Sequence, residues 1–143
     1  MTQPSQAVEA ALRALRARDR SVAELDERLS ARGAGPAERR DVLELLERVG
    51  YVDDRRFADT RAAALAARGS GDALIRDDLE RRGVAAETIA AALAGLEPEL
   101  VRAERIVARR GHSVKTARHL AARGFDEVAI VSAVALDGPG EVE

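Results

Sequence analysis

The sequence predicts an all-α protein built from three tandem three-helix repeats. A Leu-x-x-Arg-Gly motif occurs three times, and its glycines, Gly33, Gly83 and Gly124, are 50 and 41 residues apart. Each copy closes one helical pattern and is followed by another, while no segment shows the alternation of a β-strand. The positions four residues before and ten residues before and after each glycine are apolar in every copy. A helical period of roughly forty to fifty residues is typical of stacked repeats, each too small to bury a core alone.

This periodicity predicts three structural units with a short extension at each end. Hydrophobic residues make up 46% of the chain but aromatic residues only 2%, so the core must consist of Leu, Val, Ile and Ala. Such residues favour many short helices in close contact. The predicted stretches are a disordered N-terminus at 1–7, the first repeat at 8–50, the second at 51–96, the third at 97–136 and a flexible tail at 137–143.

Capping signals and apolar spacing predict the helices of the first repeat. A helix over 8–18 precedes Ser21 and Glu24, which have the spacing of a capping box, in which each side chain accepts from the other residue's backbone amide. Gly33 supplies the left-handed residue that ends the second helix. Pro36 suits the first turn of the third helix. The predicted buried stripe of that helix consists of Val42, Leu45, Leu46 and Val49.

Two adjacent carboxylates open the second repeat. Asp53 and Asp54 suit the N-cap and the first turn of a helix that reaches about residue 68. The alternative is a metal-binding or acid–base pair, but the sequence places no further acid or histidine to complete such a site. We therefore interpret both aspartates as structural.

The aromatic residues Tyr51 and Phe57 have two interpretations. Phe57 is predicted to be the largest core residue of the second repeat, with Tyr51 packed beside it and its hydroxyl outward. The alternative is that the rings stack on nucleic-acid bases. The position of Phe57 on the apolar face of its helix favours the core.

The remaining helices follow from the same signals. Asp72 is predicted to cap a helix that Gly83 ends, and a short Ala-rich helix follows at 86–94. The third repeat is predicted to hold helices over 98–110, 114–124 and 125–136, with Gly124 ending the second of these. The apolar face of the last helix is predicted to consist of Val128, Val131 and Ala135.

Positive charge is concentrated in the third repeat, although the formal net charge of the chain is −2. Spacing of three and four residues places Arg102, Arg105 and Arg109 on one helix face, and a similar basic line follows on the next helix. Because unbalanced like charge destabilises a fold, an acidic protein surface or phosphate is a plausible partner, and a solvated face is the alternative. The predicted partner-binding residues are Arg102, Arg105, Arg109, Arg110, Lys115, Arg118 and Arg123, with Arg13, Arg16 and Arg20 as a secondary patch.

Signals for catalysis, cofactors and membranes are missing from the sequence. There is no cysteine, and His112 and His119 without a patterned acid do not make a tetrahedral metal site. Neither a Gly-x-Ser-x-Gly elbow nor a phosphate-binding loop occurs. No stretch approaches the roughly 18 apolar residues of a membrane span, and the N-terminus lacks the features of a secretory signal. We expect a cytoplasmic, monomeric protein that is not an enzyme and holds no cofactor.

Three signatures follow one another along the chain. They are Ala17-Arg-Asp-Arg-Ser-Val-Ala-Glu-Leu25, Gly50-Tyr-Val-Asp-Asp-Arg-Arg-Phe-Ala58 and Leu120-Ala-Ala-Arg-Gly-Phe125. With them the chain resembles the RecX family, bacterial regulators of the RecA recombinase. The resemblance covers about residues 8–136, and its most specific element is Gly-Tyr-Val-Asp-Asp-x-x-Phe-Ala.

The resemblance implies an elongated, curved helical array that binds along the groove of the RecA–DNA filament. It implies that the protein restrains filament growth and lowers ATP hydrolysis, strand exchange and the coprotease activity that triggers the SOS response. The alternative function is a helical DNA-binding module, since a three-helix unit is similar to a helix-turn-helix. The net charge of −2 indicates that direct binding to single- or double-stranded DNA is weak.

Overall fold

The computed structural model describes residues 4–135, in which every secondary-structure element is an α-helix. The predicted all-α class and its helical repeats are confirmed. The flexible tail predicted at 137–143 lies outside the described residues. In chain order the helices are α1 (Pro4–Ala17), α2 (Val22–Ala31), α3 (Pro36–Arg48), α4 (Asp54–Ala67), α5 (Asp72–Arg81), α6 (Ala86–Ala94), α7 (Glu99–Arg110), α8 (Val114–Ala122) and α9 (Glu127–Ala135).

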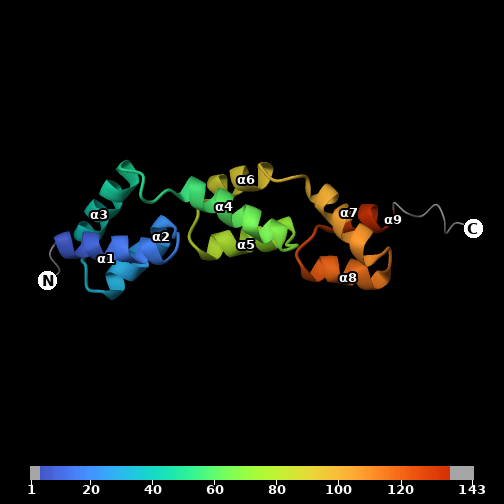
Figure 1. The fold of residues 1–143 in the computed structure, drawn as a ribbon, viewed down its shortest axis with the longest axis horizontal. Coiled ribbons are helices and arrows are strands. Elements are labelled where there is room, and N and C mark those ends of the chain that lie inside the picture. Colours follow the sequence, from blue (N-terminus) through green and yellow to red (C-terminus); the bar gives the residue numbers. More distant parts are fainter. Residues whose placement is uncertain (1–3, 136–143) are drawn as a thin grey trace, which may run out of the picture.

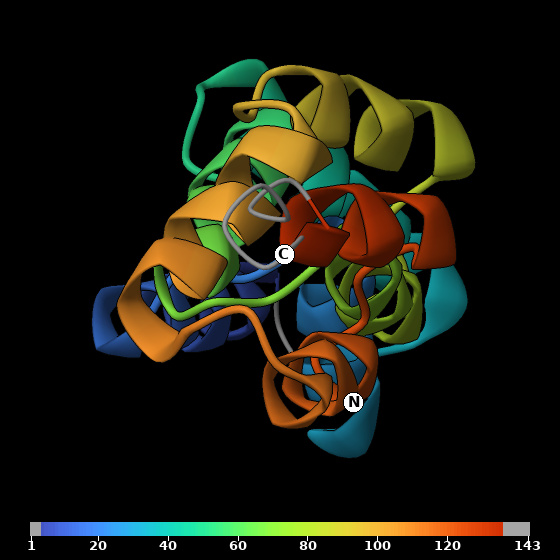
Figure 2. The same cartoon turned by 90° about the vertical axis from the view of Figure 1, so that its right-hand side faces the viewer.

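The helices form an elongated molecule of three successive triplets (Figure 1). The triplet α1–α3 lies at one end, α4–α6 in the middle and α7–α9 at the other end. A view along the long axis shows the triplets one behind another (Figure 2). The triplets are therefore arranged in a row, and each has at most two neighbours.

Each triplet has its own apolar core. The motif leucines Leu29, Leu79 and Leu120 lie at the centre of the three cores, and none is more than 1% exposed. Fully burying such a side chain stabilises a fold by about 1.5–3 kcal/mol. In every helix pair with extended contacts, such as α4 with α6 or α7 with α9, both helices come from the same triplet. The apolar cores therefore do not join the triplets, and other contacts must do so.

The first helix begins earlier than the sequence suggested. Its start at Pro4 corrects the prediction of disorder for residues 4–7. Proline suits the first helical position because its missing N–H has no partner there in any case. Ala7 is 1% exposed and lies in the first core together with Ala11 and Ala14. The small side chains of this stripe let α1 pack closely on the rest of the triplet.

The buried face of α3 differs from the predicted one. Leu45 and Val49 are 37% and 53% exposed, so their assignment to the buried stripe was wrong. The residues that α3 buries are Val42, Leu43 and Leu46. The helix carries enough apolar residues for two overlapping stripes, and its contact with α2 and α1 selects one of them.

The last helix, α9, also turns a different face inward. Val128 and Val131 are 72% and 61% exposed, so the predicted apolar face lies on the outside. Packing against α7 and α8 buries Ala129, Ile130 and Ala133 instead. Because α9 is apolar on almost every side, periodicity could not select its buried face.

Tyr51 and Phe57 lie in different triplets. Phe57 is 4% exposed in the core of the second triplet, as expected. Tyr51 does not pack beside it. The residue is 57% exposed and lines a shallow hollow together with Leu12 and Leu15 of α1. The backbone amide of Tyr51 donates to the Leu46 carbonyl, and this turn keeps the residue with the first triplet.

Helix capping follows the prediction at two sites and departs from it at a third. Ser21 and Glu24 form the capping box at the start of α2, and the Asp53 carboxylate accepts from the Arg56 amide at the start of α4. The N-cap of α5 is Gly71 rather than Asp72, which is the first helical residue. Gly71 is held in place from outside its own triplet, because its amide donates to the Arg123 carbonyl at 2.7 Å.

Candidate partner-binding surface

The junction between the first and second triplets joins the end of α5 to the start of α2. The Ser21 hydroxyl donates to the Arg82 carbonyl at 2.6 Å, and the Arg82 guanidinium donates to the Glu24 carboxylate at 2.8 Å. Gly83 lies so close to α2 that a Cβ atom added to it would be 2.4 Å from the Cβ of Ala23. The Arg-Gly pair of the motif therefore joins two triplets as well as ending a helix.

The junction between the second and third triplets repeats this arrangement. Here the end of α8 meets the start of α5, and the Gly124 carbonyl accepts from the Ala73 amide at 3.1 Å. A Cβ atom added to Gly124 would be 2.7 Å from the backbone nitrogen of Leu74. The second and third motifs thus have the same role one repeat apart.

An acidic residue from the next triplet completes each junction. Asp54, the first residue of α4, accepts from the Val22 amide at 2.8 Å, and Glu99, the first residue of α7, accepts from the Asp72 amide at 2.7 Å. Val22 and Asp72 are the first residues of α2 and α5, whose amides have no partner within their own helices. Burial raises the pKa of Asp54; the Val22 hydrogen bond opposes this, and the neighbouring charges of Asp53 and Glu24 add to it.

An ion network reinforces the first junction. Asp78 accepts from Arg61 and from Arg82, with the nearest atoms 2.9 Å apart in both pairs. The Arg61 guanidinium lowers the pKa of Asp78 and burial opposes this, while Arg82 adds to the lowering. Burial likewise opposes ionisation of Glu24, but hydrogen bonds from the Ser21 amide, Arg18 and Arg82 outweigh it and lower the pKa of Glu24. These charges satisfy one another within the protein.

Arg102 belongs to the second junction and not to an exposed surface. Only 6% of the residue is exposed, and its guanidinium donates to the carbonyls of Glu97 and Ser70 and to the Asp72 carboxylate. The guanidinium carbon also lies 5.9 Å from the centre of the Phe125 ring, within the range of a cation–π interaction. The structure therefore places Arg102, which was predicted to contact a partner, inside the junction, where its guanidinium makes internal hydrogen bonds.

Arg123 is also used at this junction. Its guanidinium donates to the Arg68 carbonyl and to the Ser70 hydroxyl, both at 3.2 Å, and the residue is half-buried. Arg20, in the secondary patch, is half-buried too and donates to the Ala14 carbonyl at 3.1 Å. Burial lowers the pKa of Arg20, and the cations of Arg18 and Arg28 add to this. These two arginines support the fold more directly than they present charge to solvent.

The remaining predicted cations do form an exposed surface at the end of the molecule. We define this basic surface as the exposed residues Arg105, Arg109, Arg110, Lys115 and Arg118 of α7 and α8. Arg105 pairs with Glu97, and no carboxylate among residues 4–135 pairs with the other four. Partial burial lowers the pKa of His119, and the cations of Arg110 and Arg123 lower it further. The two helices thus bring their positive charge together around this histidine.

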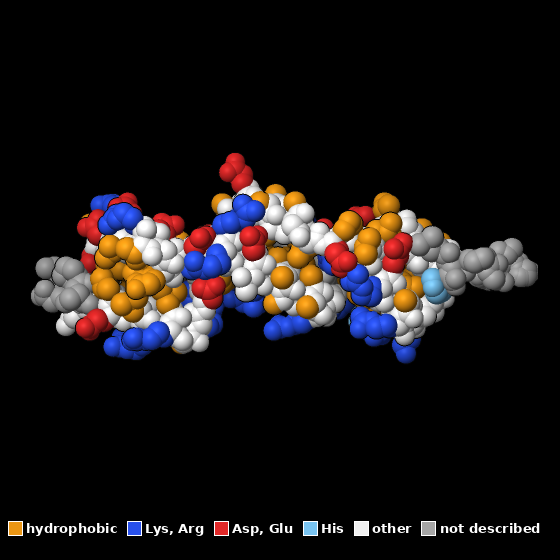
Figure 3. Space-filling model, turned by 45° about the horizontal axis from the view of Figure 1, so that its top comes forward, with side chains coloured by type: hydrophobic (Ala, Val, Ile, Leu, Met, Phe, Trp, Pro, Cys, Tyr) orange, Lys and Arg blue, Asp and Glu red, His pale blue; other side chains and the backbone are white. Residues whose placement is uncertain are grey.

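Positive charge also extends along the molecule. Arg13 and Arg16 are exposed on α1, at the opposite end from the basic surface. Figure 3 shows Lys and Arg side chains along one long edge in all three triplets. Arginine binds carboxylate and phosphate groups through charge-assisted, often bidentate hydrogen bonds. The arrangement therefore suits an extended anionic partner better than a small one.

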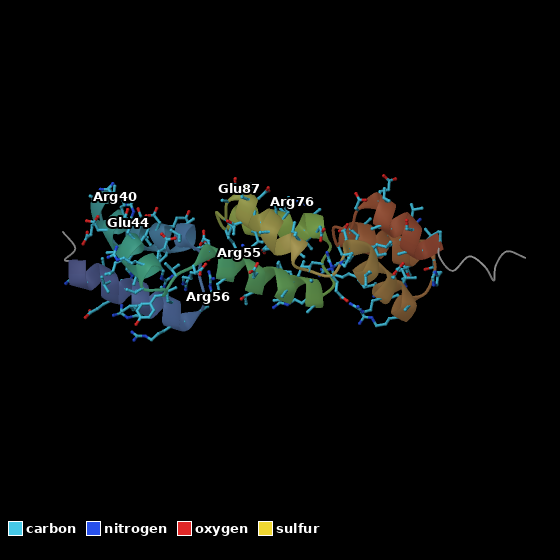
Figure 4. The ribbon with its side chains drawn as sticks, turned by 90° about the horizontal axis from the view of Figure 1, so that it is seen from above. Arg40, Glu44, Arg55, Arg56, Arg76 and Glu87 are labelled. Carbon is cyan, nitrogen blue, oxygen red and sulfur yellow. The ribbon has the colours of Figure 1, made fainter. Side chains whose placement is uncertain are left out.

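Two further exposed features were not predicted from the sequence. An apolar patch faces solvent on the first triplet (Figure 3). The exposed hydrophobic residues of this triplet include Leu45, Val49 and Tyr51. Arg55 and Arg56 project from the start of α4, where Figure 4 shows them beside the connection from the first triplet. Spacing did not predict that Leu45 and Val49 are exposed, because both residues also fit a buried stripe. The two arginines directly follow Asp53 and Asp54, whose pattern predicts only the start of a helix.

The described residues contain no metal-binding cluster and no membrane-spanning helix. Between residues 4 and 135, no group of three or more His, Asp or Glu side chains is placed to hold a metal ion. The Nδ1 atom of His112 lies 2.9 Å from the Val134 carbonyl oxygen, a contact within the third triplet. None of the helices described is both long and apolar enough to span a membrane.

The fold and surface define a class of protein: a tandem helical-repeat protein with an exposed basic surface at one end. Comparison with known proteins identifies the family. Residues 53–93, which include α4, α5 and all but the last residue of α6, match the family model described as RecX, second three-helix domain. The chain belongs to the RecX family of regulatory proteins.

Relatives match along most of the chain. It is 38% identical over 125 residues to the regulatory protein RecX of Chromohalobacter salexigens, covering 81% of this chain and 82% of that one. It is 34% identical over 139 residues to the regulatory protein RecX of Halorhodospira halophila, covering 89% and 86%. The crystal structure of RecX from Lactobacillus salivarius has a TM-score of 0.81 at 18% identity, covering 93% of this chain and 95% of that one. The last comparison supports the fold.

Proposed function

We propose that this protein binds along the RecA–DNA filament and inhibits RecA. In this proposal it restrains filament growth and lowers ATP hydrolysis, strand exchange and the coprotease activity that triggers the SOS response. It acts as a monomer in the cytoplasm, without catalysis of its own, in the regulation of DNA repair and recombination. Membership of the RecX family is the observation on which the proposal rests.

The arrangement of the triplets suits such a role. A ligand changes the assembly of a filament only through a difference in its affinity for the assembled and dissociated states. A row of three similar units can contact successive protomers at once, and the second and later contacts are strengthened by high effective concentration. The basic surface supplies charged contacts at one end of the row, and Arg13 and Arg16 supply them at the other.

Binding to assembled filaments is the direct test. RecA filaments formed on fluorescein-labelled single-stranded DNA with a slowly hydrolysed ATP analogue would be titrated with the protein and followed by fluorescence anisotropy. The proposal predicts saturable binding that free DNA of the same length does not reproduce. A protein that is folded by circular dichroism but leaves the filament signal unchanged would contradict it.

Direct action on DNA is the second candidate, and the unpaired cations of the basic surface favour it. Arg109, Arg110, Lys115 and Arg118 pair with no carboxylate among the described residues, so they are available to phosphates. A DNA-binding module would lose affinity for free DNA steeply as salt rises, with a slope set by the number of phosphates contacted. Under this candidate, Arg105→Glu combined with Arg109→Glu abolishes binding to duplex DNA. Under the RecA proposal, binding to free DNA is weak before any substitution.

A further inference from the structure

An open cleft lies at the second junction, beside the basic surface. It occupies about 480 Å³ between α4, α7 and the connection that follows α6. Its lining is mostly apolar and includes the small side chains of Ala63, Ala66 and Ala67 of α4. Arg105 and Arg109 of α7 also line it. The cleft thus combines exposed apolar surface with positive charge.

The charges of these two arginines are available to a partner. Arg109 is exposed and forms no ion pair with a carboxylate among residues 4–135. Arg105 donates to both oxygens of Glu97 at 2.7 and 2.9 Å, but both side chains are more than half exposed. Ion pairs in such exposed positions contribute little and exchange readily. An incoming carboxylate therefore meets one free guanidinium and a second whose present partner is easily displaced.

The first junction serves as an internal comparison. A hollow there is lined by Phe57, Ala64 and three arginines, Arg18, Arg61 and Arg82. Each of these arginines is paired within the protein, Arg61 and Arg82 with Asp78 and Arg18 with Glu24. The two junctions are built on the same plan, yet only the second leaves an arginine of its hollow without an internal carboxylate among the described residues. The second hollow therefore offers a guanidinium that an anionic partner can bind.

We propose that the cleft at the second junction binds a segment of the filament protein in which an aliphatic side chain neighbours a carboxylate. The aliphatic side chain lies on the alanines of α4, and the carboxylate accepts from Arg109 and Arg105. The inference rests on the proposed function, since it names the part of the surface that recognises the filament. Charge complementarity and the apolar lining together favour a protein segment over DNA phosphates, which would gain nothing from the alanines.

Filling the cleft tests the inference without disturbing the fold. Ala63 and Ala67 are exposed, and leucine is a good helix former, so Ala63→Leu and Ala67→Leu should fold normally while they occupy the cleft. Arg109→Glu removes and reverses the charge. Ala90→Leu on α6 and Arg40→Glu on α3 are matched controls at exposed positions elsewhere; Figure 4 shows Arg40 projecting from α3 in the first triplet.

Binding of each variant to RecA filaments on single-stranded DNA would be measured as above. We expect each leucine substitution and Arg109→Glu to weaken binding about tenfold or more, with the two controls within about twofold of the wild type. Equal binding by the wild type and the leucine variants would overturn the inference alone. So would loss of binding with Arg109→Glu but not with the leucines, since that pattern indicates phosphate contacts. Failure of the wild type to bind would overturn the proposed function and the inference with it.

Discussion

Replacing Gly83 with alanine tests whether close approach at the first junction holds the triplets together. The backbone at Gly83 has a φ of 81°, and an added Cβ would lie 2.4 Å from the Cβ of Ala23 in the preceding triplet. Gly50 is a matched control because its φ is 85° and nothing lies within 4 Å of an added Cβ. The two substitutions share the backbone penalty, and only Gly83→Ala also forces the junction apart.

The expected magnitudes follow from these two effects. A left-handed backbone costs an L-residue about 1–2 kcal/mol, which is the whole expected effect of Gly50→Ala. Overpacking adds about 1–3 kcal/mol, so Gly83→Ala should lower the free energy of unfolding by about 2–5 kcal/mol. Removing the opposing methyl with Ala23→Gly costs about 1 kcal/mol in helix propensity but relieves the collision. The double variant should therefore show a favourable coupling of about 1–3 kcal/mol.

Urea unfolding followed by circular dichroism at 222 nm would give these free energies for the wild type, Gly50→Ala, Gly83→Ala, Ala23→Gly and the double variant. Equal effects of Gly50→Ala and Gly83→Ala would show that only backbone conformation matters at Gly83. A double variant whose loss is the sum of the two single losses would refute the close-approach explanation even if Gly83→Ala proved strongly destabilising.

Three further predictions concern the polar contacts of the junctions. Asp54→Ala leaves the Val22 amide without its acceptor and should lower the free energy of unfolding in urea by about 1–3 kcal/mol. Asp54→Asn keeps an acceptor oxygen and should lower it clearly less. Equal losses for the two variants would count against this hydrogen bond. Arg102→Ala should lower the free energy of unfolding by about 2–4 kcal/mol, because it leaves buried acceptors without a donor. Arg105→Ala on the same helix removes one partner of an exposed ion pair and should change the unfolding midpoint little. Similar losses for the two variants would contradict the burial of Arg102. Because the folded protein has a lowered pKa at Asp78, the stabilisation from this carboxylate is complete above its ordinary pKa and is lost as pH falls below about 4. Asp78→Asn should therefore show a shallower fall in thermal midpoint between pH 5 and pH 3 than the wild type, and parallel curves would contradict that sign.

Local signals in the sequence predicted most helix boundaries. Ser21, Glu24 and Asp53 cap the helices they were expected to cap, because capping depends on residues within one turn of each other. The motif glycines likewise follow helix ends with positive φ. Such features are set by neighbours in the chain, and they need no knowledge of the rest of the fold.

Contacts between triplets could not be predicted in the same way. The spacing of Arg102 places it on the same helix face as Arg105, but spacing cannot reveal that the Ser70 carbonyl and Asp72 lie against that part of the face. Asp54 has the position of a first-turn acid, and its bond to Val22 spans 32 residues. In α9 the side chains are apolar nearly all round, so only packing decides that Val131 faces solvent. In each case the deciding contact comes from another helix.

The junctions also suggest how the row of triplets keeps its shape. Because the cores are separate, the orientation of neighbouring triplets depends on the Arg-Gly contacts and on the acids at the starts of α4 and α7. A variant that weakens a junction should therefore alter the relative placement of the triplets before it unfolds any of them. A partner that contacts all three triplets would be sensitive to that placement.

The most direct test of the regulatory role is the single-stranded-DNA-dependent ATP hydrolysis of RecA from the same organism, with this protein added at increasing ratios. Binding along the filament predicts that hydrolysis falls at well below one copy per RecA protomer, because each bound molecule affects several protomers or blocks growth at an end. Unchanged hydrolysis at equimolar protein, with the protein shown to be folded, would contradict the proposal and favour direct action on DNA.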